Sequence, residues 1–329
     1  MNEHPFASFI QILGKGKRGA RDLTQEEARE AMSRILAGEV TPEQLGAFLM
    51  LLRVKEETPA EVAGFVAAAR ASQPPAAPGM VDLDWACYAG KRRQLPWFLL
   101  AALLLASHGF KVLLHGLDHP GDHRVYVPQA LRALGLQEAR SHQEARAQLA
   151  ARGLAYLPLP VISPALQHLL ALKSVLGLRS PVHTVVRMLN PYQAPASLMG
   201  IFHPGYDLTH QQAALLLGDS RLAVFKGEGG EAECNPDGPC LVRGVFDGQA
   251  RDQEWTPQFA QRHLRDEQMD CTHLRQVWEG ALRHEYGEAA LRATAAIALV
   301  TLGQAQSPEE GLQQATHLWQ TRPLNVLSS

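Results

Sequence analysis

The chain has 329 residues, of which 46% are hydrophobic and 19% are charged, and its formal net charge at pH 7 is −2. This balance excludes an intrinsically disordered chain, and the length is sufficient for two hydrophobic cores. Because the whole molecule is close to neutral, a polyanion would be attracted only by a local cluster of basic residues.

Membrane and secretory classes are not expected either. The longest apolar run, Trp97 to Ala106, is about half as long as a bilayer span requires. The first twenty residues contain Glu3, Lys15 and Arg18 and no continuous apolar segment, so they do not resemble a signal peptide. The four cysteines form no CxxC pair, which is typical of idle thiols in a reducing compartment. We expect a soluble, cytoplasmic protein with no membrane partner.

Residues 1–73 are predicted to form a helical domain. Thr24, with Glu27 three residues later, is a capping box at a helix start, and Thr41-Pro42 and Thr58-Pro59 each place a capping hydroxyl before a proline. Three short helices with such apolar faces cannot bury them alone. We therefore expect this domain to pack on the rest of the chain or on a second copy, as in a homodimer.

A linker of proline, alanine and glycine follows at 73–79, and residues 80–329 are predicted to form an α/β domain. Strands are predicted at 83–85, 111–114, 154–157, 198–202, 222–225 and 241–245. Helices are predicted at 96–108, 127–134, 142–152, 164–176, 182–189 and 210–217, and again from about 272 to the end. The alternation predicts a mainly parallel sheet flanked by helices.

A basic stretch precedes the most apolar helix. Gly90, Lys91, Arg92 and Arg93 lie just before Pro96, which suits the first helical position. Cations at a helix N-terminus oppose the helix dipole, but together with free helix N–H groups they make an anion site. The alternative is a solvated basic loop.

Two further loops follow predicted strands. The first contains His115, Gly116, His123 and Arg124, and its arginine is a candidate phosphate ligand. Its histidines lack the carboxylate-backed spacing of a metal site, so surface imidazoles are favoured over metal ligands. The second loop is glycine-rich and begins at Lys226, and its alternative is a plain turn.

Nearly the whole chain, from Leu23 to about Asn325, resembles the anthranilate phosphoribosyltransferase family, a glycosyltransferase family with the class II nucleoside phosphorylase fold. This resemblance implies a small all-helical domain, with a further helical segment expected from about 163–190, and a larger α/β domain. The segments that carry it are Leu45–Arg53 with Glu57-Thr58-Pro59-Ala60-Glu61, Gly109–Gly116, Ser163-Pro164-Ala165 with Lys173 and Leu176-Gly177, His183-Thr184 through Asn190-Pro191, Lys226-Gly227-Glu228-Gly229, and Ser307–Gly311.

The family's catalytic motifs are altered. Its Gly-Thr-Gly-Gly-Asp loop, which wraps the pyrophosphate of phosphoribosyl pyrophosphate (PRPP), corresponds to Cys87–Lys91. Its magnesium-binding Asp-Glu pair corresponds to Glu231-Ala232, and Lys173 stands for the arginine that binds the anthranilate carboxylate. Basic residues thus replace a metal-binding carboxylate, which weakens the stabilisation of a leaving pyrophosphate.

The resemblance to a non-catalytic, DNA-binding subgroup of this family implies non-specific nucleic-acid binding, to DNA rather than RNA, with no catalytic residue, no metal and no cofactor. Phosphate contacts supply most of such affinity. The residues expected to bind phosphate are Gly90, Lys91, Arg92, Arg93, His115, Gly116, His123, Arg124, Lys173, His183, Arg187 and Lys226.

Two alternatives remain open. In the first, the chain is a phosphoribosyltransferase with an altered substrate and metal site, and Mg²⁺ is its cofactor, held by Glu228, Glu231 or Glu233. A third possibility is an inactive enzyme remnant that binds a small phosphorylated regulator.

Overall fold

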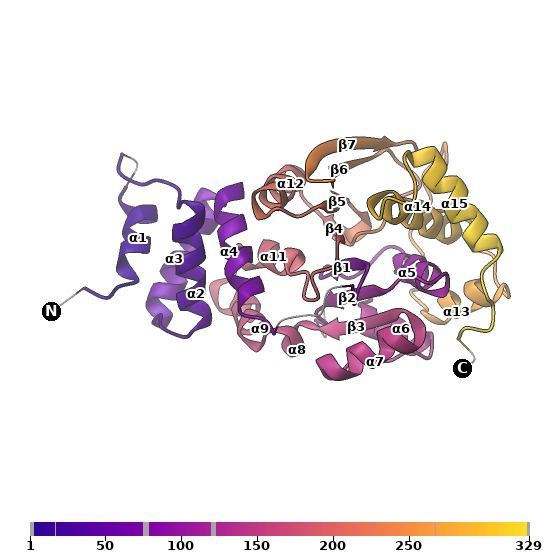
Figure 1. Cartoon of the computed structure of the whole chain (residues 1–329), viewed down its shortest axis with the longest axis horizontal. Helices are drawn as coiled ribbons and strands as arrows, with labels where there is room; N and C mark the ends of the chain where they lie inside the picture. The colour runs from indigo at the N-terminus through magenta and orange to yellow at the C-terminus, as the bar shows by residue number, and fades with distance from the viewer. Residues whose placement is uncertain (1–2, 17, 75–78, 120–122, 267, 328–329) are drawn as a thin grey trace.

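The computed structural model describes residues 3–16, 18–74, 79–119, 123–266 and 268–327. Figure 1 shows a group of helices at one end, a twisted sheet in the middle and a second group of helices beyond it, with the two chain ends at opposite sides. Residues 75–78 of the predicted linker and 120–122 of the first predicted loop lie outside the described residues.

All of the N-terminal helices but the first begin where the capping signals predict. They are α1 (Ala7–Gly14), α2 (Gln25–Leu36), α3 (Pro42–Lys55) and α4 (Pro59–Ala71). Thr24, Thr41 and Thr58 each form a complete capping box, which satisfies helix N–H groups that have no partner within the helix. Helix α1 was not predicted, and Phe9 and Leu13 bury it against the others.

The sheet has the strand order β3-β2-β1-β4-β5-β6-β7. The parallel strands are β1 (Leu83–Cys87), β2 (Val112–Gly116), β3 (Leu154–Pro158), β4 (Ala196–Ile201) and β5 (Arg221–Lys226). Strands β6 (Cys240–Phe246) and β7 (Gln249–Trp255) continue it antiparallel. The predicted fold class, a helical domain with a mainly parallel α/β domain, is confirmed.

Alternate residues of each parallel strand enter different cores. On β1, Trp85 belongs to one core and Ala86 to the other. The first core lies under α5 (Phe98–Ser107), α6 (Val127–Ala133), α13 (Thr272–Glu279), α14 (Glu285–Thr301) and α15 (Pro308–Gln320). Burial on both faces explains why these strands are continuous apolar runs.

The second core joins the other face of the sheet to the N-terminal helices. Its covering elements are α7 (His142–Arg152), α8 (Leu159–Ile162), α9 (Pro164–Ala171), α10 (Lys173–Leu176), α11 (Val182–Val185), η1 (Val186–Met188) and α12 (Tyr206–Leu217). In Figure 1, α9 and α11 lie beside α4, so part of the helical end comes from the middle of the chain.

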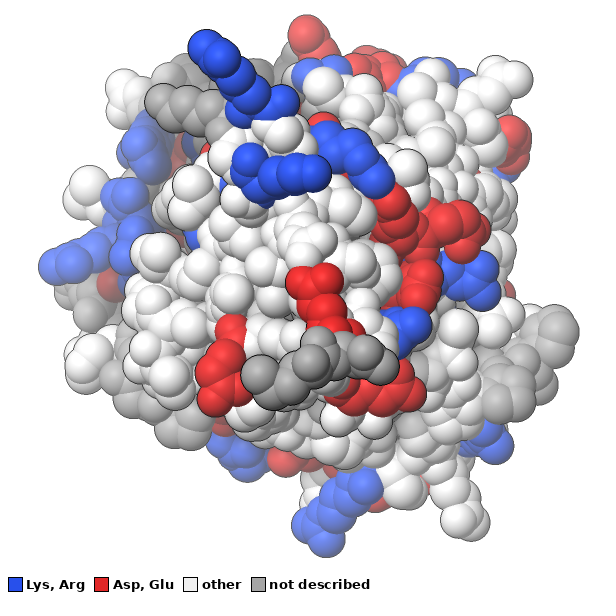
Figure 2. Space-filling view, turned by 90° about the vertical axis from the view of Figure 1, so that its left-hand side faces the viewer, with Lys and Arg blue, Asp and Glu red and all other residues white. Residues whose placement is uncertain are grey.

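The outer face of the helical end is shown in Figure 2. A largely uncharged area lies between lysine and arginine side chains near the top of this view and aspartate and glutamate side chains at its middle and right. Partly buried apolar residues on α1 and α3, among them Ile10, Ile12, Leu45 and Leu51, belong to this end of the molecule. The expected homodimer remains a prediction. Within the described part of the chain, no helix is both long and apolar enough to cross a membrane.

Candidate functional site

Two cavities adjoin at the carboxyl ends of β4 and β5, where the strand order places β1 and β4 side by side. Ligands of open α/β sheets bind at such a point because the connections diverge there. The inter-domain cavity, about 590 Å³, lies between α3, α11 and α12. The loop cavity, about 1400 Å³, lies over the glycine-rich loop after β5. Both are lined by Ile201 and Phe202.

The basic stretch after β1 differs from the expected bare cation cluster. Lys91 is fully buried, its Nζ lies 2.5 Å from Glu233 Oε1, and it also forms an ion pair with Glu228. Burial opposes its charge, but the two carboxylates prevail and raise the pKa of Lys91. Lys91 is therefore a charged structural residue and is not free to contact a polyanion.

The helix N-terminus behind this stretch is also occupied. The Phe98 N–H, at the start of α5, donates to Glu233 Oε2 at 2.8 Å. A helix N-terminus attracts anions because its first N–H groups have no partner within the helix. Here the protein supplies the anion itself, so the predicted anion site at this helix is already filled.

The glycine loop after β1 contacts a second internal carboxylate. The backbone N–H groups of Ala89 and Gly90 donate to Glu231 Oε1, at 2.8 and 2.5 Å. Burial raises the pKa of Glu231, and these two hydrogen bonds, with the nearby Arg187 and Lys91, partly offset that effect. Glu231 Oε2 is buried without a hydrogen-bond partner among the described residues.

Three predicted cations reach the loop cavity. Arg92, Arg93 and Lys226 are exposed and line the loop cavity, together with Glu228 and Asp207. The cavity therefore presents both signs of charge rather than a continuous basic groove.

The remaining predicted residues of the first loop have structural roles or lie outside the cavities. His115 is buried between Tyr88 and Asp84, with Tyr88 Oη 2.9 Å from its Nδ1 and Asp84 Oδ2 3.2 Å from its Nε2. Arg124 donates to the carbonyl of Ala89 at 2.8 Å and so supports the β1 loop from behind.

Gly116 is packed so tightly that an added Cβ would lie 1.9 Å from the Cys87 carbonyl oxygen, which explains the glycine at the end of β2. His123 and Lys173 are exposed and line neither the inter-domain nor the loop cavity.

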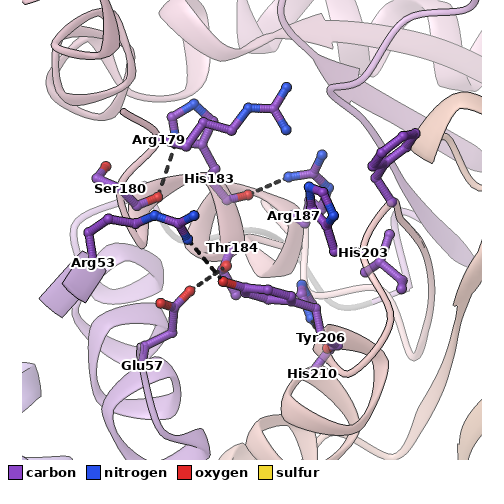
Figure 3. A pocket seen from close by; sticks show the side chains of 12 residues that line it. Arg53, Glu57, Arg179, Ser180, His183, Thr184, Arg187, His203, Tyr206 and His210 are labelled. Atoms are coloured by element: carbon purple, nitrogen blue, oxygen red, sulfur yellow. Dashed lines mark hydrogen bonds between the residues drawn. The ribbon is translucent and has the colours of Figure 1, made fainter. Parts of the chain in front are cut away.

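The inter-domain cavity contains the other two predicted residues, His183 and Arg187 (Figure 3). Arg187 is held by the carbonyls of His183 and Gly200, the latter at 3.1 Å. The guanidinium groups of Arg53 and Arg187 extend toward the cavity from opposite sides. Arg53 also donates to Tyr206 Oη at 3.3 Å.

Two imidazoles of this cavity are neutral acceptors. His183 Nδ1 lies 3.1 Å from the Ser180 carbonyl oxygen, and His210 Nδ1 lies 2.6 Å from that of Tyr206. A carbonyl accepts, so each Nδ1 carries the proton and each Nε2 is an acceptor. Burial, with nearby arginines, lowers the pKa of His183 to about 3, and burial lowers that of His210 to about 4.

Sequence reasoning missed most of the residues that line the inter-domain cavity, among them Arg53, Glu57, Tyr206 and His210. Arg53 and Glu57 come from the helical end, and Tyr206 and His210 come from α12. Thr184 Oγ1 donates to Glu57 Oε1 at 2.9 Å, which links the two regions. Glu57 lies in a motif already noted for its resemblance, whereas no local pattern distinguishes His210 from any other helical histidine.

Comparisons with known proteins agree with this architecture. Residues 8–73 match a family model described as the helical bundle domain of a glycosyl transferase family, and residues 98–321 match the a/b domain of the same family. The chain is 31% identical to an anthranilate phosphoribosyltransferase of Methylocella silvestris, over 92% of this chain and 88% of that protein.

Solved structures show the same fold. The anthranilate phosphoribosyltransferase of Thermus thermophilus matches with a TM-score of 0.76 and 23% identity, over 98% of this chain and 99% of that chain. The Saccharomyces cerevisiae enzyme in complex with PRPP and Mg matches with a TM-score of 0.78 and 16% identity, over 99% and 96%.

These findings correct two predictions. Non-specific DNA binding as the function is wrong, because similar proteins with a named activity are anthranilate phosphoribosyltransferases. The physical reason is visible in the site, where Glu228 and Glu233 neutralise Lys91. The expected absence of a cofactor is also wrong, because such enzymes have been solved with PRPP and Mg.

Proposed function

The chain belongs to the glycosyl transferase family of the anthranilate phosphoribosyltransferases, and from this premise we propose that it transfers a phosphoribosyl group from PRPP to a nitrogen acceptor other than anthranilate. One observation carries the proposal: the loop cavity and the inter-domain cavity share Ile201 and Phe202 as walls. A group transfer needs two substrates held side by side, which two adjoining cavities provide.

The loop cavity suits the diphosphate side of the donor. Arg92, Arg93 and Lys226 line it, and direct contacts from arginine and lysine are strong for phosphate oxygens. The glycine-rich loop after β5 approaches the same space, since Gly227 and Gly229 are also in the wall. Backbone N–H groups of such loops add further donors.

Mg²⁺ fits the carboxylates of this loop. No group of three or more His, Cys, Asp or Glu side chains forms a metal site among the described residues. Mg²⁺ commonly needs only one or two carboxylates, because substrate phosphates and water complete its shell. Glu231 Oε2, buried without a hydrogen-bond partner in the described structure, is a suitable ligand, and Glu228, three residues earlier, lines the loop cavity. When bound, the ion would neutralise charge on the departing pyrophosphate.

The inter-domain cavity suits an acceptor that carries both an acidic group and an N–H. Arg53, Arg179 and Arg187 line it and would bind the acidic group. His210 Nε2 is buried without a partner among the described residues and would accept the N–H. Lys173, the counterpart of the family's anthranilate-binding arginine, is exposed and lies outside this cavity. The acceptor is therefore bound by different groups from those that hold anthranilate.

The residues then have distinct roles in the transfer. The bond between the sugar C1 and the pyrophosphate oxygen breaks, and a bond from C1 to the acceptor nitrogen forms. The nitrogen loses its proton in the process. The low pKa values of His183 and His210 keep both imidazoles unprotonated at neutral pH, so His210 orients the N–H and can receive that proton as a weak base.

A direct assay tests this proposal. The full-length protein is incubated with PRPP, Mg²⁺ and single acceptors from a panel of aromatic and heteroaromatic amino acids, anthranilate included, and pyrophosphate release is measured. We expect release with an acceptor other than anthranilate. Arg187→Met should lower kcat/KM by about 100-fold, because a charged hydrogen bond to substrate contributes on the order of 2–3 kcal/mol.

The matched control is Arg251→Met. Arg251 is an exposed arginine on β7 that stacks on Phe246 and lines neither cavity, so its loss should leave kcat/KM unchanged. Absence of release with every acceptor, at PRPP and Mg²⁺ concentrations that saturate binding, would contradict the proposal.

A further inference from the structure

The amide donors of the β1 loop are already hydrogen-bonded to a carboxylate. Glu231 Oε1 accepts from Ala89 N at 2.8 Å and from Gly90 N at 2.5 Å. Two converging backbone N–H groups in a glycine turn are a common cradle for a phosphate oxygen. Gly90 adopts a φ of +65° there, a left-handed conformation that glycine adopts without strain. The carboxylate of Glu231 thus stands where a phosphate oxygen would bind.

The two buried carboxylates of this region differ in how firmly they are held. Glu233 uses both oxygens, since Oε1 pairs with Lys91 at 2.5 Å and Oε2 accepts from Phe98 N at 2.8 Å. Glu231 uses only Oε1, and its Oε2 is buried without a hydrogen-bond partner in the described structure. An unpartnered buried oxygen destabilises its own position. Glu233 is therefore fixed, whereas Glu231 is the carboxylate that can be drawn away.

The backbone of Glu231 is held in place by its neighbours. An added Cβ on Gly227 would lie 1.6 Å from the Glu231 carbonyl oxygen, and one on Gly200 would lie 2.2 Å from its carbonyl carbon. The ends of β4 and β5 thus pack directly against this backbone. The loop stays in place, and a change of side-chain rotamer is the remaining way to vacate the amides.

We propose that Glu231 is a specificity-determining plug, which lets the Ala89 and Gly90 N–H groups bind a diphosphate only when the diphosphate arrives with a divalent cation. The cation offers the displaced carboxylate a new partner, and the diphosphate takes over the two N–H groups. If an anion binds without a metal, the carboxylate of Glu231 is displaced, has no new partner and lies next to the anion. Two negative charges that lie so close together repel each other. The plug selects metal-chelated diphosphates over free phosphates and polyphosphate chains. This inference rests on the proposed function, from which it takes the ligand. It adds a condition for binding, namely that the diphosphate carries a divalent cation.

Binding of inorganic pyrophosphate to the full-length protein tests the plug. Isothermal titration is carried out with Mg²⁺ and with EDTA for the wild type, Glu231→Ala and Glu231→Gln. The exposed residue Glu39, between α2 and α3, supplies the control variant Glu39→Ala. We expect the wild type and Glu39→Ala to bind at least 10-fold more weakly in EDTA, and Glu231→Ala to bind pyrophosphate in EDTA at least 10-fold more tightly than the wild type does.

Glu231→Gln guards against misfolding of the alanine variant. The amide oxygen of the glutamine can still accept from Ala89 and Gly90 but carries no charge. The Mg²⁺ dependence of pyrophosphate binding in Glu231→Gln should therefore fall between those of the wild type and Glu231→Ala. Amide hydrogen exchange gives a second readout. Exchange at Ala89 and Gly90 should be slow in the wild type and faster in Glu231→Ala, and pyrophosphate should slow it again.

The outcomes separate this inference from the proposed function. Equal Mg²⁺ dependence in the wild type and Glu231→Ala, or unchanged exchange at Ala89 and Gly90, overturns the plug. Failure of all proteins to bind pyrophosphate even with Mg²⁺ overturns the plug and the donor site together. The expected binding pattern without product from any acceptor supports the plug and rejects the transferase.

Discussion

Single residues decide the electrostatics of this site. Lys91 and Arg92 are neighbours in a basic run, yet Lys91 is fully buried between Glu228 and Glu233 while Arg92 is exposed beside the loop cavity. Adjacent cations therefore have opposite roles. The first stabilises the fold, and the second is available to a ligand.

Replacement of Lys91 by alanine should destabilise the protein by about 3–5 kcal/mol, because the buried carboxylate of Glu233 and the partly buried carboxylate of Glu228 lose their counter-ion. The measurement is urea denaturation followed by circular dichroism. Arg92→Ala is the matched control, and a surface substitution of this kind should change the free energy of unfolding by less than about 0.5 kcal/mol. Equal effects of the two substitutions would contradict the buried ion pair.

His210 predicts a pH dependence of stability. Burial lowers its pKa from 6.5 to about 4 in the folded protein, whereas the unfolded chain keeps the ordinary value. Between these values the unfolded state binds more protons, so stability falls as the pH falls. From pH 6.5 to 5.0 the loss due to this group is about 2 kcal/mol.

Urea denaturation of the wild type and His210→Gln at both pH values tests this. The difference in unfolding free energy between the two proteins should change by about 2 kcal/mol between pH 6.5 and pH 5.0, since glutamine does not titrate. A constant difference would show that His210 is not buried in its neutral form.

At the scale of elements, one capping residue ties the helical end together. Glu61 of α4 is fully buried and accepts from Thr58 N at 2.8 Å, from Leu23 N at 3.0 Å and from Lys55 Nζ at 2.7 Å. A capping box that usually serves only its own helix therefore also fixes the chain before α2 and the end of α3.

Glu61→Ala should lower the unfolding free energy by about 3 kcal/mol, because it leaves the N–H groups of Leu23 and Thr58 without their acceptor and removes one of the two carboxylates that pair with the half-buried Lys55. Gln44→Ala in the exposed capping box of α3 is the control, with an expected loss of about 0.5–1 kcal/mol. Similar losses, measured by thermal or chemical unfolding, would mean that Glu61 only caps its helix.

At the scale of the whole molecule, the inter-domain cavity depends on how the helical end is attached to the sheet. Arg70 of α4 forms a two-pronged ion pair with Asp219, at 2.6 and 2.9 Å, and also donates to the Met188 carbonyl. These contacts hold α4 against the end of η1 and against the segment that follows α12, and residues of η1 and α12 line the cavity.

Arg70→Met should lower the unfolding free energy by about 1–3 kcal/mol and raise KM for the acceptor more than it lowers kcat, because the contact positions a cavity wall without touching substrate. Arg34→Met is the control, since Arg34 pairs with Glu30 on the surface of α2 alone. An unchanged KM in Arg70→Met would show that the cavity is formed without this contact.

The sequence by itself determined the helices with capping signals and the parallel strands. Thr24, Thr41 and Thr58 act within their own turn, and strands buried on both faces are continuous apolar runs. Strand β7 was missed because five of its seven residues are exposed and it lacks such a run. The Asp247-Gly248 turn before it, with both φ angles positive, was the local signal.

Only the tertiary structure decided what the site contains. Lys91 and Glu233 are separated by 142 positions in the chain, so the run of basic residues could be seen in the sequence but its counter-ions could not. The same is true of Glu231, which meets Gly90 across 141 positions, and of His210, which faces a cavity built from three regions. Local patterns determine helices and strands because those interactions are short in sequence, whereas charge and access in a cleft depend on neighbours that only folding brings together.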